Sequence, residues 1–193
     1  MSSTQVFDWE SKYQAGTTGW ERGHLNPAFL TWRASGELAP CRILIPGCGR
    51  SEEPAELANA GFDVTALDIA PSAVAFQQQR LGSAGKAILA DLFAWEPETP
   101  FDTIYDQTCL CALPPSLLPA YEARLTNWLR PGGTLFVLFM QTPRETGPPF
   151  NCPIPRMREL FAPPRWMWPV SLPDPVKHPS GVGDEQPAVL HRL

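Results

Sequence analysis

Five short apolar runs recur through the first 140 residues, separated by segments with helical periodicity. The runs are continuous rather than strictly alternating, which is typical of strands buried on both faces of a sheet. The regular exchange of strand and helix is typical of a parallel sheet covered by helices on both sides. We therefore predict an α/β fold with a single Rossmann-like, doubly wound, mostly parallel sheet. The expected strands are residues 41–46, 63–69, 87–91, 101–107 and 134–140.

Helices are expected between most of these strands. In the first of them, Ser51 is expected to cap the N-terminus and Gly61 to end the helix. In the last, Leu118, Tyr121 and Leu125 recur at spacings of three and four, which is typical of an amphipathic helix. The predicted helices cover residues 51–61, 71–81 and 117–129.

Proline divides the chain into a core and a loop-rich C-terminal part. The sequence holds 23 prolines, and twelve of them lie between residues 142 and 187. This stretch is expected to be an ordered lid rather than a second domain. We predict one domain over residues 1–193. Its parts are an aromatic N-terminal lid (1–35), the core sheet (36–140), a Pro-rich C-terminal insertion that forms a second lid (141–186) and a final strand (187–193).

Charge and hydropathy exclude several classes of protein. The formal net charge is −5, and no basic run exceeds two residues, so nucleic acid is not expected as a partner. The longest apolar run, Thr134 to Met140, is far shorter than the roughly 20 residues of a membrane helix. The polar start, Met1 to Gln5, does not resemble a signal peptide. A cytoplasmic protein without a membrane partner is expected.

The cysteines and histidines do not predict a metal site. Five cysteines are an odd number, and without a secretory signal they are expected to be reduced thiols. Cys109 and Cys111 form a C-x-C pair, but the three histidines are scattered singly and supply no second ligand pair. We therefore expect both cysteines to be buried and to pack as small apolar side chains. His178 lies in a proline-flanked loop and is expected to be exposed to solvent.

The ligand of an open α/β sheet binds outside the carboxyl ends of the strands, near the point where strand order reverses. Gly47 and Gly49 would let the backbone approach a ligand closely, although a tight structural turn also explains a lone G-x-G. Asp68 follows Gly49 by nineteen residues, the usual distance for an acid that bonds ribose hydroxyls. The other candidates at strand ends are Asp91, Asp106 and Gln107.

The bound nucleoside is expected to lack phosphates and to carry a positive charge. Glu52 and Glu53 stand in the first turn after the glycine loop, where two carboxylates would repel a pyrophosphate. Trp9 and Tyr13 lie four residues apart on one predicted helical face, and Trp20 follows. Aromatic faces attract a cation, although these rings would also serve simply to pack on the sheet. S-adenosylmethionine, a sulfonium nucleoside, fits this pattern best.

The motifs together resemble one known family. They are W-x3-Y-x2-G-x3-W at residues 9–20, IPGCGR at 45–50, ALDIA at 66–70, FDTIYDQTCLCAL at 101–113, LRPGG at 129–133 and GPPF at 147–150. Each motif is modest alone, but their order and spacing are specific. The chain resembles the thiopurine S-methyltransferase family of class I S-adenosylmethionine-dependent methyltransferases, which includes the thiol and halide methyltransferases.

The resemblance implies a set of cofactor-binding residues. The three aromatic side chains of the N-terminal segment would cover the cofactor, with the glycine loop beside it. The acid after the second strand would bind the ribose, and the residues after the third strand would flank the adenine. The implied positions are Trp9, Tyr13, Trp20, Gly47, Gly49, Asp68, Ile69, Asp91, Leu92 and Gln107.

The resemblance also implies an acceptor pocket, at which this chain departs from the family pattern. In such enzymes the residue after the YD of the fourth strand faces the transferred methyl and the acceptor, so the resemblance implies a catalytic position at Gln107. Thiopurine-methylating members usually carry arginine there, and the thiol and halide branch often carries an aromatic residue. Thiopurine as the natural substrate is thereby put in doubt. Asp106 would orient Gln107 or accept a proton, or serve only the structure. The pocket wall is expected to include Thr108, Pro148, Pro149 and Phe150, although a rigid turn with a buried Phe150 also explains GPPF.

The predicted function is methyl transfer from S-adenosylmethionine to a small soft nucleophile, above all a thiol or thiolate. Such thiolates need alignment and exclusion of water more than a strong base. The alternatives are a halide methyltransferase, an O-methyltransferase for a small phenol or acid, and a module that binds S-adenosylmethionine without catalysis. The partner is a small-molecule methyl acceptor, and the sequence leaves monomer and dimer open.

Overall fold

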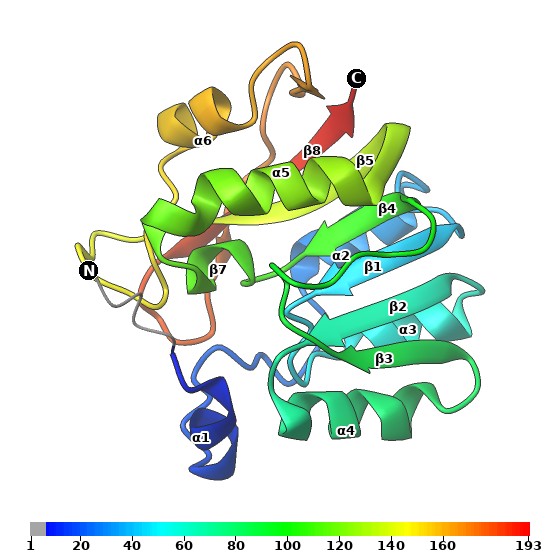
Figure 1. Ribbon diagram of the computed structural model, residues 1–193. Coiled ribbons are helices and arrows are strands. Elements are labelled where there is room, and N and C mark those ends of the chain that lie inside the picture. The colour runs from blue at the N-terminus through cyan, green and yellow to red at the C-terminus, as the bar shows by residue number, and fades with distance from the viewer. Residues whose placement is uncertain (1–6) are drawn as a thin grey trace.

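The computed structural model, which describes residues 7–193, joins eight strands in one sheet (Figure 1). The strands are β1 (Arg42–Pro46), β2 (Asp63–Asp68), β3 (Gly85–Leu89), β4 (Phe101–Asp106), β5 (Leu129–Gln141), β6 (Trp166–Met167), β7 (Val176–Lys177) and β8 (Asp184–Arg192). The first five are parallel in the order β3-β2-β1-β4-β5. Strand β8 adds to β5 in antiparallel register, and β6 and β7 pair with β8.

Helices cover both faces of the sheet, and successive residues of a strand face opposite sides. Ile43 and Ile45 pack with α2 and α3, whereas Leu44 packs with α5 and α6, as the alternation of a strand requires. This packing on both sides explains the continuous apolar runs in the sequence. The helices are α1 (Trp9–Gln14), α2 (Pro27–Ala34), α3 (Glu53–Asn59), α4 (Pro71–Leu81), α5 (Leu118–Trp128) and α6 (Ile154–Leu160), with 3₁₀ turns η1 (Leu110–Ala112) and η2 (Pro115–Leu117).

The strand order reverses between β1 and β4. From β1 the chain moves outward through β2 to β3, and β4 then returns to the other side of β1. This arrangement confirms the predicted doubly wound α/β fold. The carboxyl ends of β1, β2 and β4 meet at the reversal, so the loops that follow them lie around one point.

Several predicted elements begin or end differently in the structure, and three of these differences change the place of a predicted residue or break. Strand β3 ends at Leu89, so Asp91 lies two residues beyond the strand rather than at its end. Ser51 does not cap α3, because the cap position is Glu52, and the Ser51 carbonyl instead accepts a hydrogen bond from Gln77. The predicted break at residues 131–133 lies inside β5, which starts directly after α5 and shifts register against β4.

The C-terminal part holds more regular structure than the proline pattern predicts. Helix α6 and the short strands β6 and β7 all lie within residues 141–186. The last strand spans residues 184–192 rather than 187–193, because it pairs along β5 as far as Gln141. Helix α2, which the sequence patterns did not predict, buries Phe29 and Trp32 against the sheet. Within residues 7–193, no helix has the length and apolar character needed to cross a membrane.

Candidate functional site

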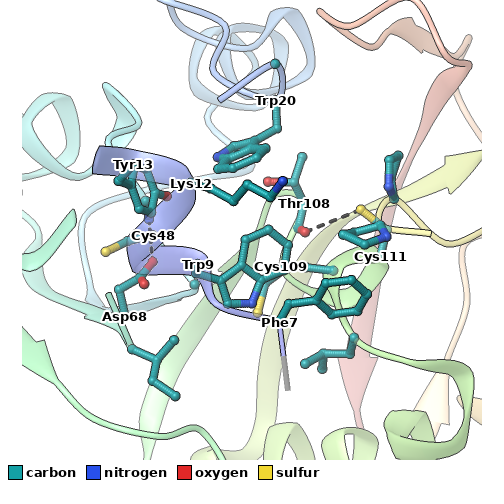
Figure 2. A pocket seen from close by; sticks show the side chains of 18 of the residues that line it. Phe7, Trp9, Lys12, Tyr13, Trp20, Cys48, Asp68, Thr108, Cys109 and Cys111 are labelled. Atoms are coloured by element: carbon teal, nitrogen blue, oxygen red, sulfur yellow. Dashed lines mark hydrogen bonds between the residues drawn. The ribbon is translucent and has the colours of Figure 1, made fainter. Parts of the chain in front are cut away.

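A cavity of about 700 Å³ lies at the carboxyl ends of the parallel strands, at the strand-order reversal. Its floor is made by the loops after β1, β2, β3 and β4, and its roof by aromatic residues of the N-terminal segment (Figure 2). A side wall comes from the loop before α6 and from the β7–β8 hairpin. Three segments far apart in the sequence therefore enclose one space.

The loop after β1 needs its two glycines. Both have positive φ angles, +56° at Gly47 and +52° at Gly49. A Cβ atom at Gly47 would lie 2.7 Å from the sulfur of Cys109, and one at Gly49 would lie 2.8 Å from the hydroxyl of Tyr13. The glycines thus let the loop fit between η1 and the N-terminal segment, and both line the cavity as predicted.

Asp68 links the loops after β1 and β2 in the floor of the cavity. Its Oδ2 accepts a hydrogen bond from the backbone N–H of Gly49 at 2.8 Å, and its Oδ1 accepts one from Ala70 at 2.9 Å. Burial raises the pKa of this carboxyl group. Each oxygen keeps a second lone pair for a ligand hydroxyl. Ile69 beside it is half exposed and also faces the cavity.

The residues after β3 form the next part of the floor. Asp91 accepts a hydrogen bond from the backbone of Phe93 at 2.8 Å, which closes a tight turn. Asp91, Leu92 and Phe93 all line the cavity. The structure therefore brings the predicted positions 68, 69, 91 and 92 together on one side.

The aromatic roof is an ordered cluster. Trp20 meets Trp9 and Tyr13 edge-to-face, with ring centroids 5.4 Å and 5.7 Å apart. The three rings lie over the cavity, as Figure 2 shows, so they pack on one another above it rather than only on the sheet. Arg50 in the floor lies over the Tyr13 ring at 5.1 Å and donates to Glu21 at 2.6 Å and 2.7 Å. These contacts hold the N-terminal segment on the core.

The other half of the cavity is apolar and contains sulfur. Thr108 has a positive φ of +64°, an uncommon value for a residue with a Cβ, and its carbonyl accepts from the Cys111 thiol at 3.3 Å (Figure 2). Cys109 and Cys111 line the wall with Leu113. Burial raises the pKa of both thiols well above the ordinary value, so they remain protonated.

Only two of the three residues predicted from the GPPF loop lie in the wall of the cavity. Pro148 and Pro149 line the cavity. Phe150 is not among the lining residues of the described chain, because its backbone N–H bonds the carbonyl of Cys111 at 2.7 Å and its ring packs edge-to-face on Phe7. The hydrogen bond to Cys111 ties this loop to η1, so Phe150 acts here as a packing residue under the wall.

Asp106 and Gln107 do not face the cavity in the part of the chain that the structure describes. Asp106 is fully buried behind η1, where it accepts hydrogen bonds from Tyr121 at 2.8 Å and from the backbone of Leu110 at 3.2 Å. Burial raises its pKa to about 6. The amide oxygen of Gln107 accepts from the Tyr105 hydroxyl at 2.6 Å. Tyr105 is buried among residues of α2, so this hydrogen bond holds the Gln107 side chain away from the cavity.

The two acidic residues at the start of α3 also turn away from the cavity. Glu52 pairs with Arg80, and Glu53 is buried and accepts a hydrogen bond from the backbone of Asn26 at 2.8 Å. Their charges are therefore engaged elsewhere and would not repel a pyrophosphate in the way that their place in the sequence predicts.

Several cavity residues were missed by reasoning from sequence. His178 was expected to be exposed, but that prediction is wrong, because the β7–β8 hairpin turns it inward and leaves it 4% exposed. Ser180 of the same hairpin and Arg144 also line the cavity. No local signal marks these positions, since their place depends on the pairing of β7 with β8 and on the lid contacts.

Comparisons with known proteins agree with this geometry. Residues 4–171 match the family model described as thiopurine S-methyltransferase. "Probable thiol methyltransferase 2" of Arabidopsis thaliana is 31% identical over 169 residues, which cover 84% of this chain and 75% of that protein. A thiopurine S-methyltransferase of Legionella pneumophila (strain Paris) is 27% identical over 172 residues, covering 78% of this chain and 77% of that protein.

Solved structures share the fold at lower identity. The 1,6-didemethyltoxoflavin-N1-methyltransferase of Burkholderia thailandensis, solved with its substrate and S-adenosylhomocysteine, superposes with a TM-score of 0.71 at 24% identity. The match covers 96% of this chain and 85% of that one. The family model covers most of the sequence, and the family resemblance carried by the motifs is thereby confirmed: the chain belongs to the thiopurine S-methyltransferase family.

Proposed function

We propose that the protein transfers the methyl group of S-adenosylmethionine to a small thiol or thiolate. The observation that carries the proposal is the single cavity whose cofactor side holds Asp68 and the aromatic roof and whose other side is apolar and lined by thiols. Membership of an S-methyltransferase family supports the same class of activity. Together they make a small-molecule methyl acceptor the expected partner.

The residues on the cofactor side suit a nucleoside that lacks phosphates and carries a positively charged sulfonium group. Asp68 offers acceptor lone pairs for ribose hydroxyls, and Leu92 and Ile69 offer apolar surface for a base. Trp9 and Trp20 place aromatic rings over the same space, where they would stabilise a cation by about 0.5 to 2 kcal/mol. S-adenosylmethionine supplies an electrophilic methyl group when it is bound there.

The residues on the acceptor side suit a soft nucleophile. The wall of Cys109, Cys111, Leu113 and the two prolines 148 and 149 is apolar, so an acceptor that enters loses much of its water. A thiolate is less strongly solvated than an alkoxide and reacts well in such surroundings. Alignment and exclusion of water are then the main contributions of this chain.

Asp106 acts as a positioning residue in this proposal. Its carboxylate accepts hydrogen bonds from Tyr121 and from the first residue of η1, and so it holds the segment that carries Cys109 and Cys111. Gln107 similarly joins the end of β4 to the packed side chain of Tyr105. Neither residue needs to touch the acceptor to fix the shape of the wall.

The test is turnover of methyl-labelled S-adenosylmethionine against an aryl thiol, hydrogen sulfide, a thiopurine, iodide and a catechol. Label on an aryl thiol or sulfide supports thiol methylation, and comparison with the thiopurine ranks the substrates. Label on iodide alone would identify a halide methyltransferase, and label on the catechol alone an O-methyltransferase. Tight cofactor binding without any S-adenosylhomocysteine formed would indicate a binding module.

A further inference from the structure

The β7–β8 hairpin brings a histidine, a serine and a glutamate together beside the acceptor side of the cavity. His178 and Ser180 line the cavity, and Glu185 lies behind His178 with 1% of its surface exposed. All three follow residue 171, where the match to the family model ends. The proposed methyl transfer to a thiolate makes no use of them.

The hydrogen bonds of His178 fix which ring nitrogen carries the proton. Its Nδ1 lies 2.6 Å from the hydroxyl oxygen of Ser180 and 3.3 Å from the backbone nitrogen of the same residue. A backbone N–H can only donate, so Nδ1 is an acceptor and is unprotonated. The proton of the neutral imidazole is therefore on Nε2.

Nε2 points toward a carboxylate oxygen to which no donor of residues 7–193 forms a hydrogen bond. The distance from His178 Nε2 to Glu185 Oε1 is 3.9 Å, and within the described part of the chain neither of these buried atoms has a hydrogen-bond partner. The other oxygen of Glu185 accepts from Arg22 at 3.0 Å and from the side chain of Asn26 at 2.8 Å. The carboxylate is thus anchored on one side and free on the side of the imidazole.

Burial and the charge of Arg22 keep His178 neutral at pH 7. Burial and the nearby Arg22 lower its pKa to about 4, and burial raises the pKa of Glu185. The neighbouring Lys177 and Asp184 pair with each other on the outer side of the hairpin, and Glu53 is engaged by Asn26. Glu185 is the acidic group that faces the ring.

We propose that Ser180, His178 and Glu185 form a proton relay for methyl acceptors that arrive protonated, such as alkyl thiols. The inference rests on the proposed function. The acceptor sulfur forms a bond to the methyl carbon as the sulfonium carbon–sulfur bond breaks, and the leaving group departs as a neutral thioether. The acceptor proton passes to the Ser180 oxygen while the Ser180 proton passes to His178 Nδ1, and Glu185 faces the resulting imidazolium.

A weak base is sufficient for this task. A thiol proton becomes strongly acidic once its sulfur carries a methyl group, so an imidazole of lowered pKa still accepts it. An aryl thiol that is ionised at neutral pH has no proton to give and does not need the relay. The substrate class that depends on His178 is therefore the alkyl thiol, and the class that does not is the ionised aryl thiol.

The experiment compares wild type, Ser180→Ala and His178→Gln on 2-mercaptoethanol and on 4-nitrothiophenol at pH 7. Both variants are expected to lower kcat for 2-mercaptoethanol by roughly 100-fold, because a general base contributes at least about that much to a rate. They are expected to lower kcat for 4-nitrothiophenol by less than about threefold. His24→Gln, at an exposed histidine outside the cavity, is the matched control and is expected to change neither. Equal losses on both thiols, or no loss on either, would overturn the relay.

A second readout does not depend on turnover. The ¹⁵N chemical shifts of the His178 imidazole at pH 7 are expected to show the Nε2–H form, and the Nδ1–H form would contradict the relay. Melting temperatures and cofactor dissociation constants of the variants identify any loss of folding. A wild-type protein that methylates neither thiol would contradict the proposed function itself, whereas wild-type turnover with equal losses in the variants would contradict the relay alone.

Discussion

Glu10 in α1 accepts two hydrogen bonds from Ser72 at the start of α4, one from its backbone N–H at 2.9 Å and one from its hydroxyl at 2.6 Å. The two residues are 62 positions apart in the sequence. Because Trp9 and Tyr13 lie on the same short helix, this pair of bonds fixes the aromatic roof to the core. Helix α1 has only six residues and relies on such contacts for its position.

Replacing Glu10 with alanine is expected to weaken the binding of S-adenosylmethionine at least about fivefold, because it removes both hydrogen bonds to Ser72, each worth about 0.5 to 1.5 kcal/mol. The roof would then be closed for a smaller fraction of the time. Isothermal titration calorimetry measures the change. Glu98→Ala removes the same charge at an exposed position outside the cavity and is the control. Equal affinities for both variants would show that the Glu10–Ser72 contact does not hold the roof.

Asp68→Ala is expected to weaken cofactor binding by at least about 100-fold, since it removes hydrogen bonds of a charged acceptor and loosens the loop at Gly49. The control is Asp63→Ala, which removes a carboxylate at the exposed start of the same strand. It tests whether the loss of any carboxylate from β2 weakens cofactor binding. The dissociation constants of the two variants are measured by calorimetry. Unchanged affinity in Asp68→Ala would exclude the ribose assignment.

The elements that the sequence predicted well are those encoded by local pattern. Most of strand β1 and most of the second half of β5 are continuous apolar runs, whereas β2, β3 and β4 also contain polar residues. Asp68 and the two glycines follow from the order strand, loop, helix, strand. These features need no knowledge of distant contacts. The fold and the place of Asp68 and the glycine loop at the cavity were therefore predictable, whereas their contact with a cofactor stays a prediction.

The acceptor side depends on contacts between distant segments. The side chain of Gln107 is held by the hydroxyl of Tyr105, and no local pattern in the sequence marks this contact. His178 becomes buried because β7 pairs with β8, and a strand of two residues has no recognisable pattern. Ser51 has the right chemistry for a helix cap, but the loop geometry places Glu52 there instead. Tertiary packing decided each of these positions.

Gly49→Ala tests the close contact between the glycine loop and the roof. The new Cβ would lie 2.8 Å from the Tyr13 hydroxyl, so Tyr13 would have to move, and cofactor affinity is expected to fall about tenfold or more, as for the loss of one or more hydrogen bonds. Gly82→Ala has the same φ of +52° with no neighbour within 4 Å. It is expected to lower the free energy of unfolding by about 1 kcal/mol or more without a change in affinity. A similar loss of affinity in both variants would mean that backbone strain, not the contact with Tyr13, is responsible.

Asp106→Asn tests the buried carboxyl group behind η1. Burial raises the pKa of Asp106 from 3.8 to about 6, so between pH 4 and pH 6 the folded protein keeps a proton that the unfolded chain releases. The free energy of unfolding therefore falls as the pH rises through this window, by on the order of 3 kcal/mol for a pKa raised this far. The lowered pKa of His178 acts in the opposite direction over a similar range, but it is present in both proteins and cancels in their difference. Urea unfolding measures the free energy of unfolding of the wild type and of the variant. The wild-type value minus the variant value is expected to decline from pH 4 to about pH 6 and to be constant above pH 7.

A difference that is the same at every pH would show that the pKa of Asp106 is not raised in the folded protein. The hydrogen bonds of the carboxylate would then offset the effect of its burial.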